Sequence, residues 1–336
     1  MSVLKPVGEA LGPVLASLAP PKPVEVPLAK ALGKVLAEDI RAACALPERA
    51  EALRHGFAVP SRSTIGASAE SPVMLATAPS EVMIGDTLPE GCDAVLPPDA
   101  IGAIGHAVGV TQAAAPGEAA RLVGHDIAAG RLIAGRGGIV TAEIRLILQC
   151  AGIDRVRLVE PRVALEGQRL PATGWLETTL DMLGCRLSAS SDADIAISWS
   201  HSGEPRLALQ PGATASIGPG NGRRVSIALP QRFDGLMAGF LTLALPLIAV
   251  LSHRQIRLEA RPLTHKIVST IGATDCVLLE TTRQGFKPLT SGEITLAALA
   301  DSDAFALMPP ESEGVPAGRP IAATPLNAML EEQTAP

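Results

Sequence analysis

The spacing of apolar residues along the first part of the chain predicts three helices. Apolar positions recur at helical intervals in residues 7–19 and again in residues 28–40. A third helix is expected over 142–151, because Thr141 can cap its first turn and Gly152 can end it. These three helices should pack together.

The rest of the chain is predicted to consist of short strands and helices. Residues 45–112 contain short apolar runs broken by prolines, which predicts a small β-rich domain. Residues 161–255 alternate strand and helix, as in an α/β layer with a partly parallel sheet. Residues 256–330 again show short apolar runs separated by Pro and Gly. The expected fold class is therefore α/β plus β.

One segment, Gly235–Leu251, is apolar enough to raise the question of a membrane span. It runs without a charged residue and contains Pro246. A spanning helix needs about 20 apolar residues, and this segment is shorter. We therefore expect a buried helix at the centre of the α/β layer and no membrane as a partner.

Composition narrows the classes of partner. Apolar residues make up 47% of the chain and aromatic residues 2%, with no Tyr. The cores must therefore be built from Ala, Leu, Val and Ile, and there is no aromatic platform on which bases could stack. The net charge is −6 and basic residues are not clustered, which argues against nucleic acid as a partner.

The five cysteines do not form a metal or disulfide pattern. They are widely spaced, odd in number and never arranged as C-x-x-C. This usage fits a reducing compartment, and the first residues lack the layout of a secretion signal. We therefore expect a cytoplasmic protein with no bound metal cluster.

Several segments resemble one known family. Residues 84–99 read I-G-D-T-L-P-E-G-C-D-A-V-L-P-P-D, and residues 116–140 read P-G-E-A-A-R-L-V-G-H-D-I-A-A-G-R-L-I-A-G-R-G-G-I-V. Both resemble segments of the molybdopterin molybdenumtransferase family (MoeA and the gephyrin E-domain), and other matches follow in family order. The resemblance implies an elongated, multidomain homodimer. Its implied parts are a first domain (1–45 plus 113–160), an inserted β-rich domain (46–112), a shortened molybdopterin-binding α/β domain (161–255) and a C-terminal β-barrel-like domain (256–330).

The resemblance also implies a reaction, which is the hydrolysis of adenylylated molybdopterin and the transfer of molybdate onto its dithiolene. Such chemistry needs acids that hold a divalent cation or position water. It also needs glycine-rich backbone that can approach phosphate closely. Molybdopterin is therefore the implied cofactor, and Mg²⁺ is the cation that the family would use.

The first family motif, D-N-S-A-M-D-G-Y-A-V, is altered in residues 50–59. His55 stands where the family has its second Asp, and Ile84 replaces a family Thr in the neighbouring motif. An imidazole does not hold a hard cation as a carboxylate does. His55 is thus either a catalytic acid, base or anion contact, or a half-exposed loop histidine.

The second family motif, R-x-x-G-E-D, is better kept. Arg121, Gly124 and Asp126 match it, while His125 replaces the family Glu. The resemblance implies that Asp126 is a catalytic acid and that Arg121 and His125 contact the cofactor. The alternative role of Asp126 is to stabilise a turn by bonding nearby backbone N–H groups.

The strand ends of the α/β layer have lost most family residues. The S-T-G-D signature is absent after the first strand, and Ser200 and His201 replace the central glycines of a second loop. A Cβ at each position bars the closest approach of the backbone to an anion. Gln210 and Ala213 stand where the family has lysines. The cofactor-binding residues that the resemblance still implies here are Ser198, Ser200, Ser202, Gly203, Pro211 and Gly212.

A glycine cluster at 218–222 has two interpretations. Followed by Arg223 and Arg224, it could form an anion-binding nest. Asn221-Gly222 between two strand-like runs is instead the usual signal of a hairpin turn, which we favour.

Three functions remain open from the sequence. The protein could be a molybdenumtransferase with impaired activity, or a non-enzymatic protein that binds the pterin cofactor or acts as a scaffold. Its partners would then be proteins of the cofactor pathway or a molybdoenzyme. A third possibility is new chemistry that uses His55, His125 and Asp126.

Overall fold

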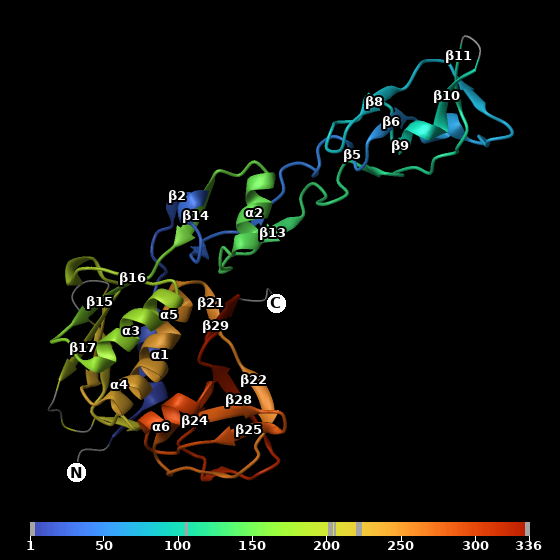
Figure 1. Cartoon of the computed structure of the whole chain (residues 1–336). Helices are drawn as coiled ribbons and strands as arrows, with labels where there is room; N and C mark the ends of the chain where they lie inside the picture. The colour runs from blue at the N-terminus through green and yellow to red at the C-terminus, as the bar shows by residue number, and fades with distance from the viewer. Residues whose placement is uncertain (1–3, 105–106, 201–203, 205, 220–223, 333–336) are drawn as a thin grey trace. The chain divides into compact units, whose positions relative to one another are not determined.

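The computed structural model describes residues 4–104, 107–200, 204, 206–219 and 224–332. The chain divides into two compact units, whose course Figure 1 follows. The first unit comprises Met1–Asp39, Gly135–Arg145 and Asp154–Pro336, and the second comprises Ile40–Ala134 and Leu146–Ile153.

The first unit contains a mostly parallel sheet with the strand order β16-β15-β17-β20-β19. Strands β16, β15, β17 and β20 run parallel, and β19 is antiparallel to β20. This topology confirms the predicted α/β layer. The strands are β15 (Arg162–Glu166), β16 (Arg186–Leu187), β17 (Ile195–Ser200), β19 (Ser216–Pro219) and β20 (Val225–Pro230).

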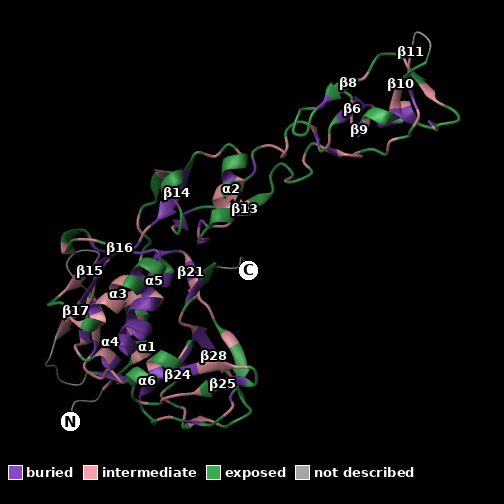
Figure 2. Cartoon of the chain, in the orientation of Figure 1, coloured by how far each residue is buried: buried purple, intermediate pink, exposed green. Residues whose placement is uncertain are grey.

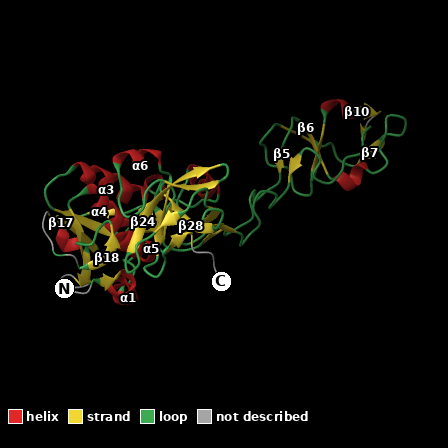
Figure 3. Cartoon of the chain, turned by 90° about the horizontal axis from the view of Figure 1, so that it is seen from below, coloured by secondary structure: helices red, strands yellow, loops and turns green. Residues whose placement is uncertain are grey.

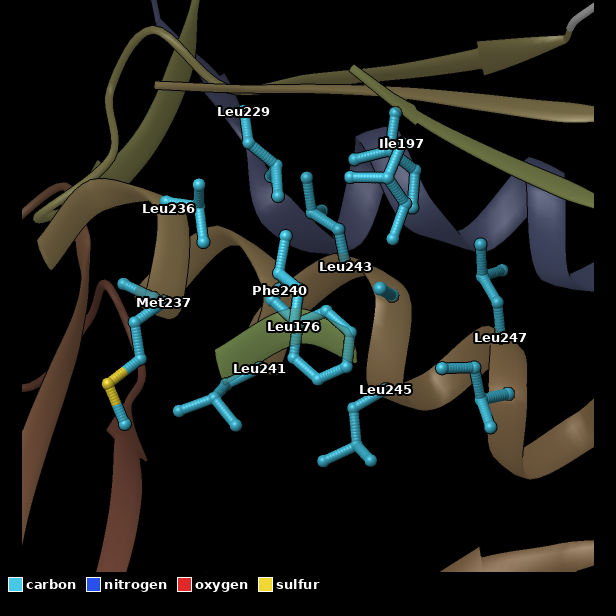
Figure 4. Close-up of a cluster of buried hydrophobic side chains, with 14 of the residues drawn as sticks. Leu176, Ile197, Leu229, Leu236, Met237, Phe240, Leu241, Leu243, Leu245 and Leu247 are labelled. Atoms are coloured by element: carbon cyan, nitrogen blue, oxygen red, sulfur yellow. The ribbon is translucent and has the colours of Figure 1, made fainter. Parts of the chain in front are cut away.

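One face of this sheet packs against helices. Alternate residues such as Ile197 and Leu229 are buried against Leu176 and Phe240, as Figure 4 shows. The Phe240 ring meets Trp175 edge to face, with ring centroids 5.4 Å apart. The helices are α1 (Val7–Ser17), α3 (Pro171–Met182), α4 (Phe233–Gly239), a π-helical turn (Phe240–Ala244) and α5 (Leu245–Leu251).

The apolar helix Phe233–Leu251 is part of this core. It is long and apolar enough to cross a membrane, but 89% of its most apolar window is buried within the protein. Figure 2 shows the burial along α4 and α5. The prediction of a buried core helix is therefore confirmed.

A second sheet of the first unit has the order β1-β18-β24-β26-β28-β22, and β25 pairs with β24. Leu209 of β18 and Leu278 of β24 belong to the same core as the α/β layer, so the two sheets share a hydrophobic cluster. The elements are β1 (Lys5–Pro6), β18 (Leu207–Gln210), β22 (Glu259–Pro262), β24 (Thr274–Thr282), β25 (Gly285–Pro288), α6 (Leu296–Asp301), β26 (Ala304–Met308) and β28 (Pro320–Pro325).

Small sheets complete the first unit. The sheet β2-β14-β3 consists of β2 (Val24–Pro27), β14 (Arg155–Val159) and β3 (Val35–Leu36). Two further pairs join β21 (Arg254–Ile256) to β29 (Leu330–Glu332) and β23 (Ile267–Val268) to β27 (Gly314–Val315).

The predicted helix over 28–40 is wrong. Only Leu28–Lys30 form a short 3₁₀ turn, and Gly33 has a φ of 75°. The apolar residues that suggested a helix instead pair with another strand, because Val35 and Leu36 lie opposite Val159 and Leu158 of β14. Tertiary burial has overridden a helical pattern.

The second unit confirms the prediction of a β-rich region, and Figure 3 shows it as strands, loops and short helical turns. Gly85 and Gly91 adopt positive φ in the turns that precede β9, as expected from residues 84–99. The strands are β4 (Ile40–Arg41), β5 (Glu51–Ala52), β6 (Gly56–Val59), β7 (Val73–Leu75), β8 (Ser80–Val82), β9 (Ala94–Leu96), β10 (Ile101–Ile104), β11 (Ala107–Val110), β12 (Ala120–Arg121) and β13 (Leu132–Ala134).

The third predicted helix is present as α2 (Ala142–Cys150). The Ile144 N–H donates to the Thr141 hydroxyl at 3.3 Å, and Gly152 has a φ of 70°. Both ends therefore follow the expected capping chemistry. The predicted hairpin near 218–224 has antiparallel flanks in β19 and β20, but its turn at 220–223 lies outside the described residues.

Candidate functional site

The carboxyl ends of the parallel strands form the first candidate locus. Glu166 of β15 lies level with Ser198 of β17, and Ser200 lies level with Pro230 of β20. Ligands of open α/β sheets bind outside this edge of the sheet. We call residues 166–170, 198–200 and 230–235 the carboxyl edge.

Two further segments meet the carboxyl edge. Gly212 has a φ of 124°, and a Cβ there would lie 3.3 Å from the Gly235 carbonyl oxygen. A Cβ on Gly292 would lie 3.8 Å from Gln210 Oε1. The turn after β18 therefore packs on the start of α4 and also faces the loop at 290–292. This brings Gly212, and with it the adjoining Pro211, to the edge, and their role in cofactor binding stays a prediction.

Sequence reasoning missed part of this locus. The sequence did not predict the loop Thr290-Ser291-Gly292 as part of the site, although Gly292 lies beside Gln210. Thr290 Oγ1 and Asp275 Oδ1 are buried without a hydrogen-bond partner among the described residues. Asp275 lies opposite Gln210 across β18 and β24. The sequence signal for this locus was Gln210, which stands at a position where the family has a lysine. Nothing in the sequence linked that position to Asp275.

Trp199 fills the space between two strand ends. Its indole Nε1–H donates to the Gln168 carbonyl at 2.9 Å. A Cβ on Gly167, whose φ is 146°, would lie 2.8 Å from the same ring. The indole therefore lies directly against the Gly167 backbone and ties the end of β17 to the end of β15.

The carboxylates of the edge are each held by an arginine. Arg232 donates to both oxygens of buried Asp234, at 3.0 and 2.7 Å, and this hydrogen bond raises the pKa of Arg232. Arg169 of the edge also pairs, at 3.2 and 2.9 Å, with Glu177 of α3, which lies outside the edge. Glu166 accepts from the Ser190 hydroxyl at 2.5 Å and from Arg224 Nη1 at 3.3 Å.

This donor set does not fit Mg²⁺. A magnesium ion needs oxygen ligands that are free to take octahedral positions. At the carboxyl edge those oxygens already accept hydrogen bonds from guanidinium groups, which a divalent cation would have to displace. No group of three or more His, Cys, Asp or Glu residues within the described ranges could hold a metal ion.

The second candidate locus is the turn around Asp126 in the second unit. Arg121 Nη1 lies 3.3 Å from Asp126 Oδ2, and His125 Nδ1 lies 3.2 Å from Asp126 Oδ1. Gly124, with a φ of 73°, allows the turn that brings these three side chains together. The Asp126 and His125 side chains are 43% and 67% exposed, so both contacts of Asp126 are open to solvent.

Asp126 also lines a small hollow of about 340 Å³. Its wall carries the Arg131 guanidinium and apolar side chains from β13 and α2. The lining residues are Asp126, Ile127, Arg131, Leu132, Ile133 and Ile147. The locus thus places a carboxylate and a guanidinium beside apolar surface, which suits a small dipolar or anionic ligand.

The other predicted site residues are scattered. His55 Nε2 lies 2.8 Å from Glu81 Oε1, and no hydrogen bond in the described part of the chain joins His55 to the Asp126 turn. The Ser198 hydroxyl donates to the Ile227 carbonyl at 3.4 Å. Ser200 is the last residue of β17, whereas Ser202 and Gly203 lie outside the described residues.

A larger hollow, of about 1450 Å³, lies at the opposite edge of the sheet, where the strands begin. Two of its three lining acids are engaged in the fold, because Asp194 pairs with Arg162 at 3.3 Å and Glu160 pairs with Lys34 at 3.1 Å. Size alone does not make it the site, since ligands of such sheets bind at the other edge.

The architecture matches the fold of solved MoeA proteins. The chain superimposes on the molybdopterin biosynthesis MoeA protein of Pyrococcus horikoshii with a TM-score of 0.77 and 21% identity, covering 96% of this chain and 99% of that one. A molybdenum cofactor biosynthesis protein of Pyrococcus furiosus gives a TM-score of 0.61 at 17% identity, covering 96% and 99%. These likenesses show the fold.

Sequence comparison shows similarity over the first part of the chain. Residues 5–152 match the family model "MoeA N-terminal region (domain I and II)". Molybdopterin molybdenumtransferase 2 of Mycobacterium tuberculosis is 31% identical over 149 residues, which are 39% of this chain and 37% of that protein. The matched part of the chain thus spans less than half the length of this curated relative. The first part of the chain is thus similar in sequence to the MoeA N-terminal region, and the chain as a whole shares the fold of the solved MoeA proteins.

Proposed function

We propose that this protein acts in molybdenum cofactor biosynthesis as a MoeA-like protein whose molybdenumtransferase activity is lost or strongly reduced. The observation that carries the proposal is the contact of the Trp199 indole with Gly167 and the Gln168 carbonyl. The names of the relatives point to molybdopterin as the class of substrate. At the carboxyl edge of this chain, however, the Trp199 indole covers backbone that such chemistry would use.

An active site of this kind must let an anion approach. Phosphate and oxyanion groups bind where backbone N–H groups are open and cations are unpaired. At the carboxyl edge the indole covers one backbone segment, and the guanidinium groups of Arg232 and Arg169 are committed to carboxylates. Loss of one preorganised group costs about 10²–10³ in rate, and several are replaced here.

The test is a reconstitution assay with adenylylated molybdopterin, Mg²⁺ and molybdate. We expect cofactor formation at least about 10²-fold below that of an active family member. A rate close to that of the active enzyme would overturn the proposal. Trp199→Ser, which opens the edge, should increase binding of molybdopterin, whereas the core variant Trp175→Phe should not. Equal responses of both variants would show that Trp199 does not obstruct the edge.

A non-enzymatic role in cofactor binding is the second candidate. It is favoured by the Asp126 turn, where the matched residues Arg121 and Asp126 remain solvent-exposed beside a hollow. Titration calorimetry with molybdopterin should then give a binding signal that Asp126→Asn weakens without loss of fold. Binding that is the same in both proteins would exclude Asp126 from the ligand site.

We extend the proposal to the molecular context of the protein. A cytoplasmic homodimer that meets proteins of the cofactor pathway or a molybdoenzyme is the arrangement expected from the family. Sedimentation at several protein concentrations tests the dimer directly, and a single monomeric species would contradict it.

A further inference from the structure

The hollow of about 1450 Å³ at the start of the parallel strands is large enough for a small organic molecule. Its lining comes from the first residues of β15, β16 and β20, from the end of α1 and from the linker 19–24. All of these segments belong to the first unit. We call this space the amino-edge hollow, and it is formed within one compact body.

The lining of the amino-edge hollow is held in place by the fold itself. Backbone bonds join the strand starts, because the Asp194 N–H donates to the Arg162 carbonyl at 2.8 Å and the Val225 N–H donates to the Asp194 carbonyl at 3.0 Å. In the linker 19–24, three prolines fix their own φ and keep each preceding residue extended. A ligand that enters therefore has little backbone to order, which favours binding.

Part of this lining is apolar and incompletely covered. Val14 and Leu18, at the end of α1, pack against the core of the α/β layer but are only half-buried. Pro20 and Pro23 of the linker also line the hollow and are exposed. A hydrocarbon group placed against these side chains leaves water, which is favourable. The hollow can therefore hold the apolar body of a ligand.

Four charged side chains of the lining are committed to the fold. Asp194, Arg162 and Glu160 take part in the ion pairs described above, and Arg224 Nη1 lies 3.3 Å from Glu166 Oε1. Arg224 Nη1 also donates to the Ser190 carbonyl at 2.9 Å. A ligand could use these groups only by breaking a pair that holds the strand starts together.

Three other charged side chains of the lining are free. Lys22, Arg186 and Asp192 are exposed, and within the described ranges their side chains make no hydrogen bond or ion pair. Two cations thus stand against one acid. Arg186 lies beside Arg162 in the parallel register of β16 and β15, and the charge of Arg162 is already balanced by Asp194. The uncommitted charge of the hollow is therefore positive, and Arg186 is its uncommitted guanidinium.

We propose that the amino-edge hollow binds an amphipathic organic anion, whose acid group pairs with Arg186 and whose hydrocarbon part lies against Val14 and Leu18. A guanidinium presents two parallel N–H groups to two oxygens of a carboxylate or a phosphate, and Lys22 adds a second positive charge to the same hollow. Carboxylates and phosphate monoesters share this chemistry, and the apolar lining selects those that carry a hydrocarbon chain.

The amino-edge hollow is separate from the carboxyl edge. Strand β15 runs from Arg162 at the hollow to Glu166 at the carboxyl edge, a distance of about 13 Å. Ligands that react on open α/β sheets lie outside the carboxyl ends of the strands, so the hollow is a site of binding rather than of reaction. Its occupancy is independent of the proposed loss of molybdenumtransferase activity.

The test is calorimetric titration of the full chain with sodium octanoate, sodium octyl phosphate and 1-octanol in separate experiments, at matched ionic strength. Both anions should bind about tenfold more tightly than the alcohol, because only they can pair with Arg186. Sodium hexanoate should bind more weakly than octanoate, by up to about fourfold for each methylene removed.

Two arginine variants separate the hollow from a general effect of charge. Arg186→Gln should weaken octanoate binding about tenfold, and it breaks no contact of the fold because Arg186 has no partner among the described residues. Arg283→Gln is the matched control, since Arg283 is also exposed but lies in the turn between β24 and β25, outside the lining of the hollow. It should leave the affinity unchanged.

The outcomes decide the proposal and separate the two acid groups. Tighter binding of octyl phosphate than of octanoate would support a phosphate monoester as the ligand, and the reverse order would support a carboxylate. Absence of saturable binding of both anions would overturn the proposal. Equal affinities for octanoate and 1-octanol would also overturn it, because no acid group would then be recognised. Equal weakening by Arg186→Gln and Arg283→Gln would do the same, since net charge alone would explain the loss.

Discussion

The Asp126 turn and the carboxyl edge both collect acidic residues, but they hold them differently. Asp126 is solvent-exposed, contacts the exposed Arg121 guanidinium and His125 imidazole, and borders a hollow. Asp234 at the carboxyl edge is buried, bonded twice to Arg232 and once, at 2.8 Å, to the Gly235 N–H. The first carboxylate is available to a ligand, whereas the second stabilises the start of a helix.

This difference shows that a residue can match a family motif without being accessible to a ligand. The residues that follow the family pattern at the Asp126 turn are accessible, so they can serve either a ligand or the turn. At the carboxyl edge, by contrast, Arg232 and Asp234 bond to one another and the Trp199 indole covers the backbone at 167–168. Measurements of the free energy of unfolding can therefore distinguish the two loci. A core residue of the sheet behind the edge provides the reference for a large loss.

The largest effect is expected on the helix-facing side of β17. Ile197 is fully buried against α3 and α4, while its neighbour Ser198 is only partly buried on the other face. Ile197→Ala should lower the free energy of unfolding of the first unit by about 3 kcal/mol, because it removes apolar contacts and leaves a cavity. Ser198→Ala should change it by less than about 1 kcal/mol. Urea unfolding followed by circular dichroism measures both. Equal losses would show that the sheet has no preferred core face.

The two carboxylates should differ next. Asp234→Ala leaves the Gly235 N–H and the start of α4 without an acceptor, so we expect a loss of about 2 kcal/mol. Asp126→Ala removes only exposed ion pairs and should change stability by less than about 0.5 kcal/mol. The same unfolding experiment compares them. A loss for Asp126→Ala as large as that for Asp234→Ala would make Asp126 a structural residue and remove the contrast between the loci.

Much of the fold could be predicted from local patterns. The alternation of strand and helix over residues 161–255 and the capping residues of α2 are short-range signals, and they predicted these elements correctly. The helix prediction for residues 28–40 failed because Val35 and Leu36 pair with β14, which lies more than 100 positions later in the chain. No local pattern contains that pairing.

The site was less predictable for the same reason. The sequence placed Pro211 and Gly212 near a cofactor by family position, but their packing on Gly235 depends on how the α/β layer meets the second sheet. The contact of Trp199 with Gly167 joins residues 32 positions apart, and it follows from the parallel register of two strands. The sequence showed which family residues had been replaced. It did not show that the Trp199 indole lies against Gly167.

The smallest effect concerns pH and contrasts the histidine beside Asp126 with one that faces an arginine. Burial, and then the positive charge of Arg136, lower the pKa of His253. The neutral imidazole therefore contributes stability in full above its unfolded pKa of about 6.5, and this contribution is lost as pH falls toward the lower folded value. The wild type should lose more thermal stability between pH 7.5 and 5.5 than His253→Asn, by on the order of 1 °C in Tm.

The variant is chosen for its backbone. His253 has a φ of 55°, a conformation that Asn tolerates, so the substitution removes the titrating ring without adding strain. His125→Asn serves as the control, since its ring faces a carboxylate rather than a guanidinium. Thermal unfolding of the three proteins across this pH range should show the reduced acid sensitivity only in His253→Asn. If His253→Asn instead follows the wild type at every pH, the Arg136–His253 contact does not govern acid stability.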